Sequence, residues 1–195
     1  MPPPSRRAVA AVLVLAAAGL VEAKPGGHPR RRPVDAVIVH SLGGPDCADG
    51  RRFYRTVEGD AASWMATFNR LPIVSIHYVI GRDGQVAAGV PEAVAAAHAT
   101  GWNQRSIGIE LVNNGDGVDP FPAVQVEALV TLVRGILARH PDVTPARILR
   151  HSDVDRSTFP EAAFGRACTA FRRKEDPGAA FPWEAFEAAV AAPRP

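Results

Sequence analysis

SIGIEL, residues 106–111, is the segment that says most about how this chain folds. Side chains in a β-strand alternate between the two faces of a sheet. The large apolar residues share one face: Ile107, Ile109 and Leu111. The other face receives the rest: Ser106, Gly108 and Glu110. A carboxylate within an apolar strand, with a glycine making room beside it, indicates either a functional site or the ordinary solvent face of an antiparallel sheet.

The sequence around this strand alternates between strand and helix patterns. Short β-branched runs and a GRDG turn predict four further strands, at residues 35–40, 73–80, 85–90 and 147–151. Apolar residues at helical spacing predict three helices, at residues 60–70, 121–140 and 182–190. Because strands and helices interleave, we expect a single α/β domain with a mixed central β-sheet flanked by helices.

Composition narrows the class of protein. The chain has 195 residues, of which 47% are hydrophobic, enough for one domain with a real core. The formal net charge is only +2, so the strong basic field of a nucleic-acid-binding protein is absent. We expect no nucleic-acid partner and, for lack of any contrary signal, a monomer.

The N-terminus has the pattern of a secretory signal. Arg6 and Arg7 precede an apolar run, residues 8–21, which is short for a membrane span, and a cleavage site of small residues ends at Ala23. An uncleaved membrane anchor is the alternative. We therefore predict a signal peptide at 1–23, a Pro-, Gly- and Arg-rich linker at 24–33 and the folded domain at 34–192. The mature protein would be exported, periplasmic or secreted, with no stable membrane anchor after cleavage.

The chain has two cysteines, Cys47 and Cys168. In an oxidising compartment they could form one disulfide closing a long loop, but sequence alone does not show that the thiols meet. An inert buried thiol is the alternative.

Two predicted strands end in histidine, at His40 and His151, and Asp176 precedes a Pro-Gly turn. Each residue alone fits a structural role. Together, two histidines and a carboxylate form a zinc-type ligand set that leaves one coordination position for water. Lys174 stands two residues before Asp176 and is one of two lysines in a chain whose other basic side chains are arginines or histidines.

Several motifs then occur in an order that resembles a known family: VIVH (37–40), SIHYVIGRDGQV (75–86), AHATGWNQRSIGIEL (97–111), ILRHSD (148–153) and RKEDPGAAFPW (173–183). The chain resembles the zinc-dependent N-acetylmuramoyl-L-alanine amidases of the type-2 family, which also includes phage lysozyme-amidases and peptidoglycan-recognition proteins. The resemblance implies an enzyme that hydrolyses the amide between N-acetylmuramic acid and L-alanine in peptidoglycan or muropeptides.

Carried over by position, the resemblance implies that Zn²⁺ is bound by His40, His151 and Asp176. Glu110 matches the glutamate that acts as general base, and Lys174 matches the lysine that stabilises the oxyanion. Three residues match a segment that borders the substrate: His98, Trp102 and Asn103.

Alternatives remain at this stage. His77 is expected to be structural, and a Cys168 thiolate competes with Asp176 as third ligand. A non-catalytic peptidoglycan-binding module and a zinc peptidase that cuts within the stem peptide are the competing functions.

Overall fold

The computed structural model describes residues 27–159, 168 and 171–193, and its centre is a five-stranded sheet. The strands follow the order β6-β5-β8-β2-β9. Their bounds are β2 Ala36–Ser41, β5 Tyr78–Ile80, β6 Val86–Ala88, β8 Ser106–Leu111 and β9 Ile148–Arg150. All neighbours in this sheet pair in parallel except β5 and β6, which pair antiparallel. The predicted mixed α/β sheet is confirmed.

The SIGIEL strand, β8, occupies the middle of this sheet, between β5 and β2. Its five residues other than Glu110 are buried. The interpretation of its polar face as the solvent face of an antiparallel sheet is therefore wrong, because β8 pairs in parallel on both sides.

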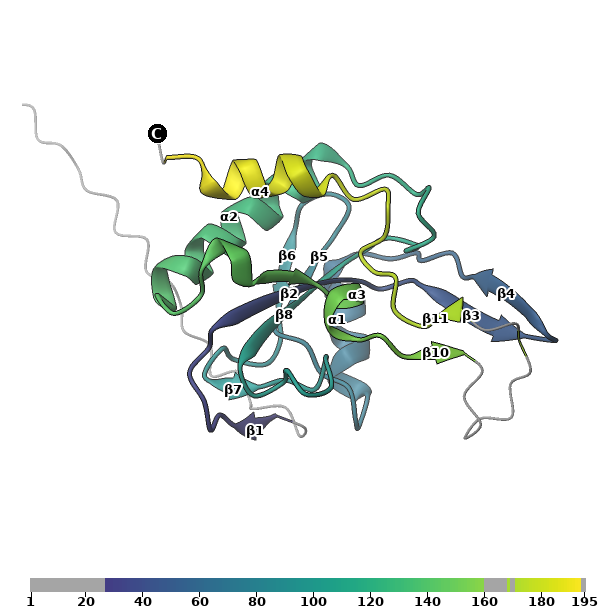
Figure 1. Cartoon of the computed structure of the whole chain (residues 1–195), viewed down its shortest axis with the longest axis horizontal. Coiled ribbons are helices and arrows are strands. Elements are labelled where there is room, and N and C mark those ends of the chain that lie inside the picture. Colours follow the sequence, from purple (N-terminus) through teal and green to yellow (C-terminus); the bar gives the residue numbers. More distant parts are fainter. Residues whose placement is uncertain (1–26, 160–167, 169–170, 194–195) are drawn as a thin grey trace, which may run out of the picture.

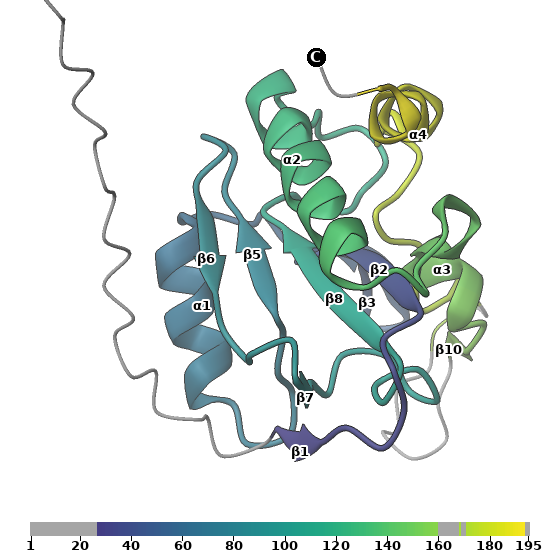
Figure 2. The same cartoon turned by 90° about the vertical axis from the view of Figure 1, so that its left-hand side faces the viewer.

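Helices cover both faces of the sheet. In Figure 1, α2 (Ala123–Arg139) and α4 (Trp183–Ala191) lie on one side, and α1 (Ala61–Arg70) lies on the other. Figure 2 shows α1 beside β5 and β6. Two apolar clusters follow from this arrangement: one joins the sheet to α2 and α4, and a smaller one joins it to α1.

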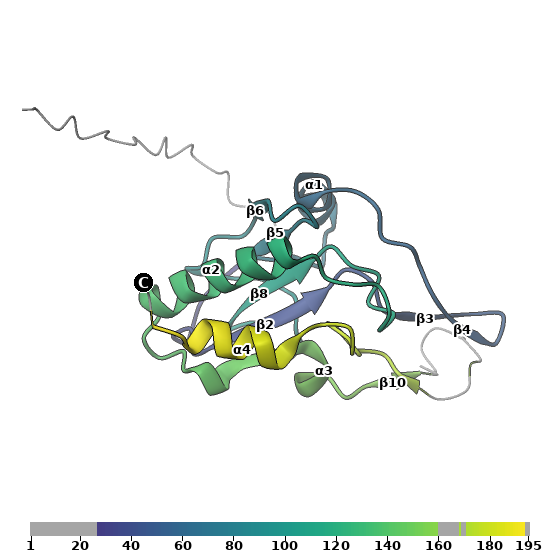
Figure 3. The same ribbon diagram turned by 90° about the horizontal axis from the view of Figure 1, so that it is seen from above.

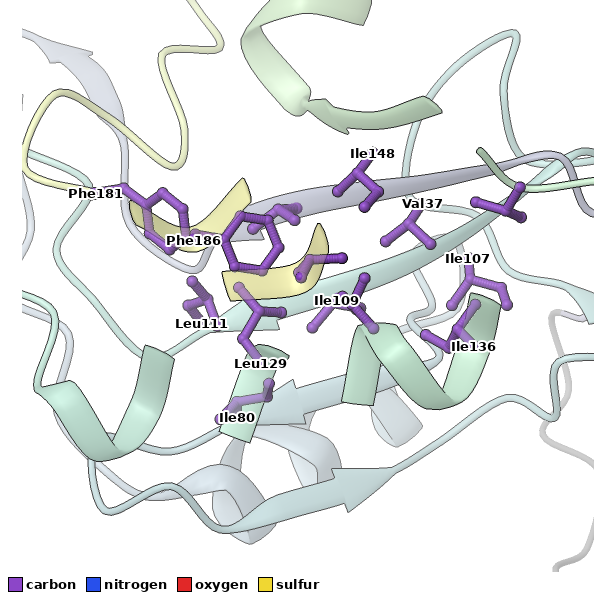
Figure 4. Packing of buried hydrophobic residues seen from close by; sticks show 14 of the residues in the cluster. Val37, Ile80, Ile107, Ile109, Leu111, Leu129, Ile136, Ile148, Phe181 and Phe186 are labelled. Carbon is purple, nitrogen blue, oxygen red and sulfur yellow. The ribbon is translucent and has the colours of Figure 1, made fainter. Parts of the chain in front are cut away.

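The larger cluster uses the apolar face of β8 (Figure 4). Ile107, Ile109 and Leu111 are fully buried against Leu129 of α2 and Phe186 of α4, among others. Burying one such side chain contributes about 1.5–3 kcal/mol relative to leaving it exposed. This packing leaves the face with Ser106, Gly108 and Glu110 turned away from α2 and α4.

The predicted helices form with local signals at their ends. Asp60 caps α1 by accepting a hydrogen bond from the Ser63 backbone N–H at 2.8 Å. Pro122 precedes α2, and Pro182 precedes α4, where a missing N–H costs the helix nothing.

Two elements differ from the sequence-based expectation. The strand expected at 73–80 begins only at Tyr78, and Ile73 is 81% exposed. No strand was predicted between residues 41 and 59, but the structure has a hairpin there, formed by β3 (Pro45–Ala48) and β4 (Arg51–Tyr54). Asp49 and Gly50 both have positive φ at its turn, and an Asp-Gly pair is the sequence signal that favours such a hairpin.

The hairpin projects beside β10 (Thr158–Phe159) and β11 (Phe171–Arg172) (Figures 1 and 3). A disulfide joins Cys47 of β3 to Cys168, so the cysteines do meet. Nearby, Tyr54 of β4 donates a hydrogen bond to Glu175 at 2.9 Å, and Arg52 pairs with the same carboxylate. The hairpin is thus attached to the segment that leads to Asp176.

The segment expected to be a linker is anchored over its described part, residues 27–33. β1 (His28–Pro29) pairs antiparallel with β7 (Val94–Ala95). Arg30 donates hydrogen bonds to the carbonyl oxygens of Glu92, Asn103 and Ser106, at 2.6, 3.2 and 2.9 Å. These bonds fix the segment to the domain, so the folded unit begins before Val34.

The predicted signal peptide, residues 1–23, lies outside the described residues. Within the part that the structure describes, no helix combines the length and apolarity needed to cross a membrane. The remaining short helices are η1 (Pro145–Arg147) and α3 (His151–Val154), which flank β9.

Candidate metal centre

Three of the predicted site residues converge at one point. His40 Nδ1 lies 2.9 Å from His151 Nδ1, and Asp176 Oδ2 lies 2.9 Å from His151 Nδ1 and 3.4 Å from His40 Nδ1. All three side chains are buried. The sequence separated them by up to 136 positions, and only the fold brings them together.

Strand register places two of them. β8, β2 and β9 are neighbours in parallel, and His40 stands directly opposite Glu110. Val39 pairs with Arg150, so His151 follows at the same edge, as the first residue of α3. Because parallel strands end at a common edge, residues near their carboxyl ends meet there. The backbone N–H of Ser152 donates to the carbonyl of Asp176 at 3.1 Å and so holds the third ligand beside α3.

The size of this triangle fits a zinc ion. Tetrahedral zinc with nitrogen and oxygen ligands at about 2.0–2.1 Å needs donor atoms about 3.3 Å apart. The observed separations of 2.9–3.4 Å are close to that value. Two imidazoles and a carboxylate are also the donor set of many catalytic zinc sites. His40, His151 and Asp176 would therefore hold a zinc ion.

The electrostatics favour the metal-binding protonation states. Burial lowers the pKa of His40 to about 4, so its imidazole is neutral at pH 7. Burial alone would raise the pKa of Asp176, but its contacts with the rings of His151 and His40 outweigh burial and hold this pKa well below its usual value. A neutral imidazole and an ionised carboxylate are the forms that bind a cation.

Glu110 stands beside the ligands with one oxygen unpaired. Its Oε2 is buried and has no hydrogen-bond partner among the described residues. Burial and the charge of Asp176 raise the pKa of Glu110 to about 8, and the Lys174 ammonium opposes that rise. A carboxyl group with a pKa near neutrality suits proton transfer.

A cavity of about 640 Å³ opens over this centre. Its lining includes all five residues predicted for metal binding and catalysis: His40, Glu110, His151, Lys174 and Asp176. Apolar side chains also contribute, Trp64 and Phe68 from α1 and Ile73 beyond it. Another part of the wall is charged, with Asp46 and Arg55 paired at 3.2 Å. The sequence did not predict these wall residues, because no motif around them indicates a site. The hairpin turn at Asp49-Gly50 and helix α1 bring them to the cavity.

The residues predicted to border the substrate have separate positions. His98 and Asn103 line the cavity. Asn103 Oδ1 accepts hydrogen bonds from the backbone N–H groups of His98 and Ala99, at 3.0 and 2.7 Å, so it shapes the loop. Trp102 lies outside the cavity lining, with its ring facing the guanidinium groups of Arg105 and Arg147.

The alternatives for His77 and Cys168 are settled by contacts. His77 is fully buried, and its Nδ1 accepts a hydrogen bond from the backbone N–H of Gly108 at 3.0 Å, which agrees with a structural role. The alternative of Cys168 as a metal ligand is wrong, because its sulfur is bonded to Cys47.

Comparison with known families agrees with this geometry. The profile of a family described as N-acetylmuramoyl-L-alanine amidase matches residues 30–179. Among curated proteins, the chain is similar to the 1,6-anhydro-N-acetylmuramyl-L-alanine amidase AmpD of Enterobacter cloacae, with 32% identity over 87% of this chain and 90% of the relative.

Solved structures show the same fold. One is a selenomethionine derivative of AmpD, with a TM-score of 0.61 and 23% identity over 87% of this chain and 93% of that one. Another is the N-acetylmuramyl-L-alanine amidase AmiD of E. coli, with a TM-score of 0.56 and 28% identity over 83% of this chain and 58% of that one. That AmiD structure contains anhydro-N-acetylmuramic acid linked to L-Ala-D-γ-Glu-L-Lys.

Proposed function

The chain belongs to the N-acetylmuramoyl-L-alanine amidase family and is an amidase of peptidoglycan or muropeptides, and we propose that it works as a zinc enzyme. His40, His151 and Asp176 would hold the metal, Glu110 would be the general base and Lys174 would stabilise the oxyanion. The observation that carries the proposal is the convergence of three donor atoms at 2.9–3.4 Å under a cavity lined by Glu110 and Lys174.

A zinc ion bound there would lower the pKa of a water molecule toward neutrality and polarise the substrate carbonyl. Glu110, whose Oε2 is unpaired, takes a proton from the attacking water as oxygen adds to the carbonyl carbon. The Lys174 ammonium faces the same cavity and stabilises the negative charge that develops on the carbonyl oxygen. The carbon–nitrogen bond then breaks, Glu110 delivers its proton to the amine of L-alanine, and the lactyl carboxylate remains.

A digest of purified substrates tests this proposal. The substrates are intact peptidoglycan and an anhydro-muropeptide like the one in the AmiD structure. Mass spectrometry is expected to find free stem peptides that begin at L-alanine, lost after chelation and restored by zinc. Cuts within the stem peptide would instead support the peptidase alternative. Full hydrolysis after exhaustive chelation would contradict the zinc proposal.

We also propose that the mature protein works outside the cytoplasm, as the N-terminal pattern at 1–23 predicts. The disulfide between Cys47 and Cys168 supports this, because such bonds persist in oxidising compartments. Fractionation of cells that express the chain with and without residues 1–23 tests the location. Retention of both forms in the cytoplasm would contradict it. The monomeric state stays a prediction, which sedimentation can measure.

A further inference from the structure

His98 contacts a proposed metal ligand from the side opposite the metal. Its Nδ1 lies 2.9 Å from His40 Nε2, while His40 Nδ1 faces His151 and Asp176. The two rings meet edge to face, with centroids 5.1 Å apart. His40 therefore uses one ring nitrogen for the ligand cluster and the other for His98.

Behind His98 lies a chain of hydrogen bonds that ends at a backbone carbonyl. His98 Nε2 lies 3.1 Å from Ser106 Oγ, and Ser106 Oγ lies 2.8 Å from the carbonyl oxygen of Trp102. Ser106 is fully buried, so water does not replace these partners.

The carbonyl sets the direction of the chain, because it can only accept. Ser106 donates its hydroxyl hydrogen to Trp102 and so accepts from His98 Nε2–H. A neutral His98 then has an unprotonated Nδ1, which accepts the hydrogen on His40 Nε2. The reverse direction would leave the lone pairs of the Ser106 hydroxyl and the carbonyl facing each other at 2.8 Å. In the favoured direction, His40 Nδ1 carries no hydrogen, as metal binding requires.

The sequence reserves space for this arrangement. A Cβ on Gly108 would lie 2.5 Å from His98 Nδ1 and 2.7 Å from Ile76 Cδ1. An alanine there would displace the ring that accepts from His40. Asn103 fixes the loop from the other end, through the backbone N–H groups of His98 and Ala99.

We propose that His98 is a positioning residue for the metal centre: backed by Ser106 and the Trp102 carbonyl, it holds His40 in the tautomer whose Nδ1 can bind the metal. The inference rests on the proposed role of His40 as a ligand. Partners of this kind orient metal-binding histidines, and losing one typically lowers metal affinity about 10- to 100-fold.

The experiment compares the wild type with His98→Leu and His98→Asn. Ring ¹⁵N chemical shifts of His40 are measured in metal-free protein with labelled histidine and assigned with His40→Gln, and zinc affinity is measured by chelator competition. We expect the wild-type His40 to carry its hydrogen on Nε2. In His98→Leu, the Nδ1–H tautomer should grow and zinc affinity should fall about 10- to 100-fold. The His98→Asn substitution places an amide oxygen near the lost Nδ1 and should restore most of both.

Two further variants separate positioning from local packing. Ile76→Val changes the other side chain over Gly108 without removing a polar group, so it should leave the His40 shifts and zinc affinity unchanged. Ser106→Ala removes the hydroxyl that orients His98, so it should cause an intermediate loss of the Nε2–H tautomer of His40 and of zinc affinity. This variant replaces His98→Leu in the experiment if His98→Leu does not fold.

Unchanged His40 shifts and a zinc affinity within about twofold of wild type, in both His98→Leu and Ser106→Ala, would overturn the inference. A wild-type protein that binds no zinc would instead contradict the proposed function. The His40 tautomer in the metal-free protein would still decide the role of His98 in that case.

Discussion

His40 of β2 and His77, which directly precedes β5, are both buried histidines, and they differ in what surrounds their rings. They are 1% and 0% exposed, and burial lowers the pKa of each to about 4. His77 Nδ1 accepts from the backbone N–H of Gly108, and its Nε2 lies 3.0 Å from the carbonyl oxygen of Val94. Backbone groups thus fix both ring nitrogens, and the Arg30 guanidinium lies beside them.

His40 is surrounded by side chains instead: His98 on one nitrogen, and His151 and Asp176 on the other. It also lines the cavity. Burial and a lowered pKa therefore do not identify a functional histidine. What identifies it is a ring nitrogen directed at other ligand atoms and at a space that a substrate can enter.

Substituting each of the two histidines separately should give the largest difference in hydrolysis rate and zinc content. His40→Ala should lower the hydrolysis rate about 10³-fold or more and remove bound zinc, because it deletes a proposed ligand. His77→Gln should keep zinc and most activity but lower the free energy of unfolding by about 1–3 kcal/mol, because the Gly108 N–H loses a well-placed acceptor. Zinc content, hydrolysis rate and denaturant unfolding measure these effects. Loss of zinc in the His77 variant and not in the His40 variant would reverse the assignment.

Glu110→Gln tests the group that stands in register beside His40. Hydrolysis should fall about 10²- to 10⁴-fold, because the amide cannot accept the proton of the attacking water. Zinc content should remain that of the wild type, since Glu110 is not among the three converging ligands. Equal activity in this variant would remove Glu110 from the mechanism.

Lys174→Met should lower the hydrolysis rate about 10²- to 10³-fold with zinc retained, by removing the cation at the oxyanion. Lys174→Arg is the matched variant. It keeps the charge but replaces a compact ammonium with a planar fork, so we expect only partial recovery. Steady-state rates on an anhydro-muropeptide measure both. Full activity of Lys174→Met would show that Lys174 does not stabilise the oxyanion.

The smallest expected effect concerns stability of the metal-free protein against pH. The folded pKa of Glu110 is raised to about 8 from 4.5, so the folded state binds more protons than the unfolded state between these values. Wild-type stability relative to Glu110→Gln is therefore fully present below about pH 4.5 and is lost as pH rises to about 8.

Denaturant unfolding of both proteins at about pH 4, 6 and 9 measures this difference, and the comparison cancels the titration of the buried histidines. Saturating zinc should shrink it, because a nearby cation favours the carboxylate. A difference that does not change with pH would show that Glu110 titrates near its ordinary value in the folded protein.

Local patterns in the sequence predicted much of the fold. Alternation in SIGIEL identified β8 and its two faces, and helical spacing identified α1, α2 and α4. The strand expected at 73–80 was too long, because its β-branched residues also suit an exposed wall of the cavity: Ile73 lines it and is 81% exposed. The hairpin at 45–54 was missed although Asp49-Gly50 signals it.

The candidate site divides in the same way. Family motifs identified the three proposed metal ligands, together with Glu110 and Lys174, because these residues stand next to recognisable local sequence. The positioning role inferred for His98 could not be predicted from the sequence. A contact with substrate and a contact with His40 would both place the same residue in the same loop, so the sequence does not distinguish them.

Local sequence was enough to predict which residues of β8 point to the core and which point away, because a strand has a strict two-residue period. It also determined the chemical types available to the site. Tertiary contacts were needed to show that the polar face of β8 serves the proposed metal centre at three alternate positions. Ser106 links His98 to the Trp102 carbonyl, Gly108 makes room for His98, and Glu110 lines the cavity. Strand register is the cause: parallel pairing with β2 sets His40 opposite Glu110, and no local pattern in the sequence encodes that pairing.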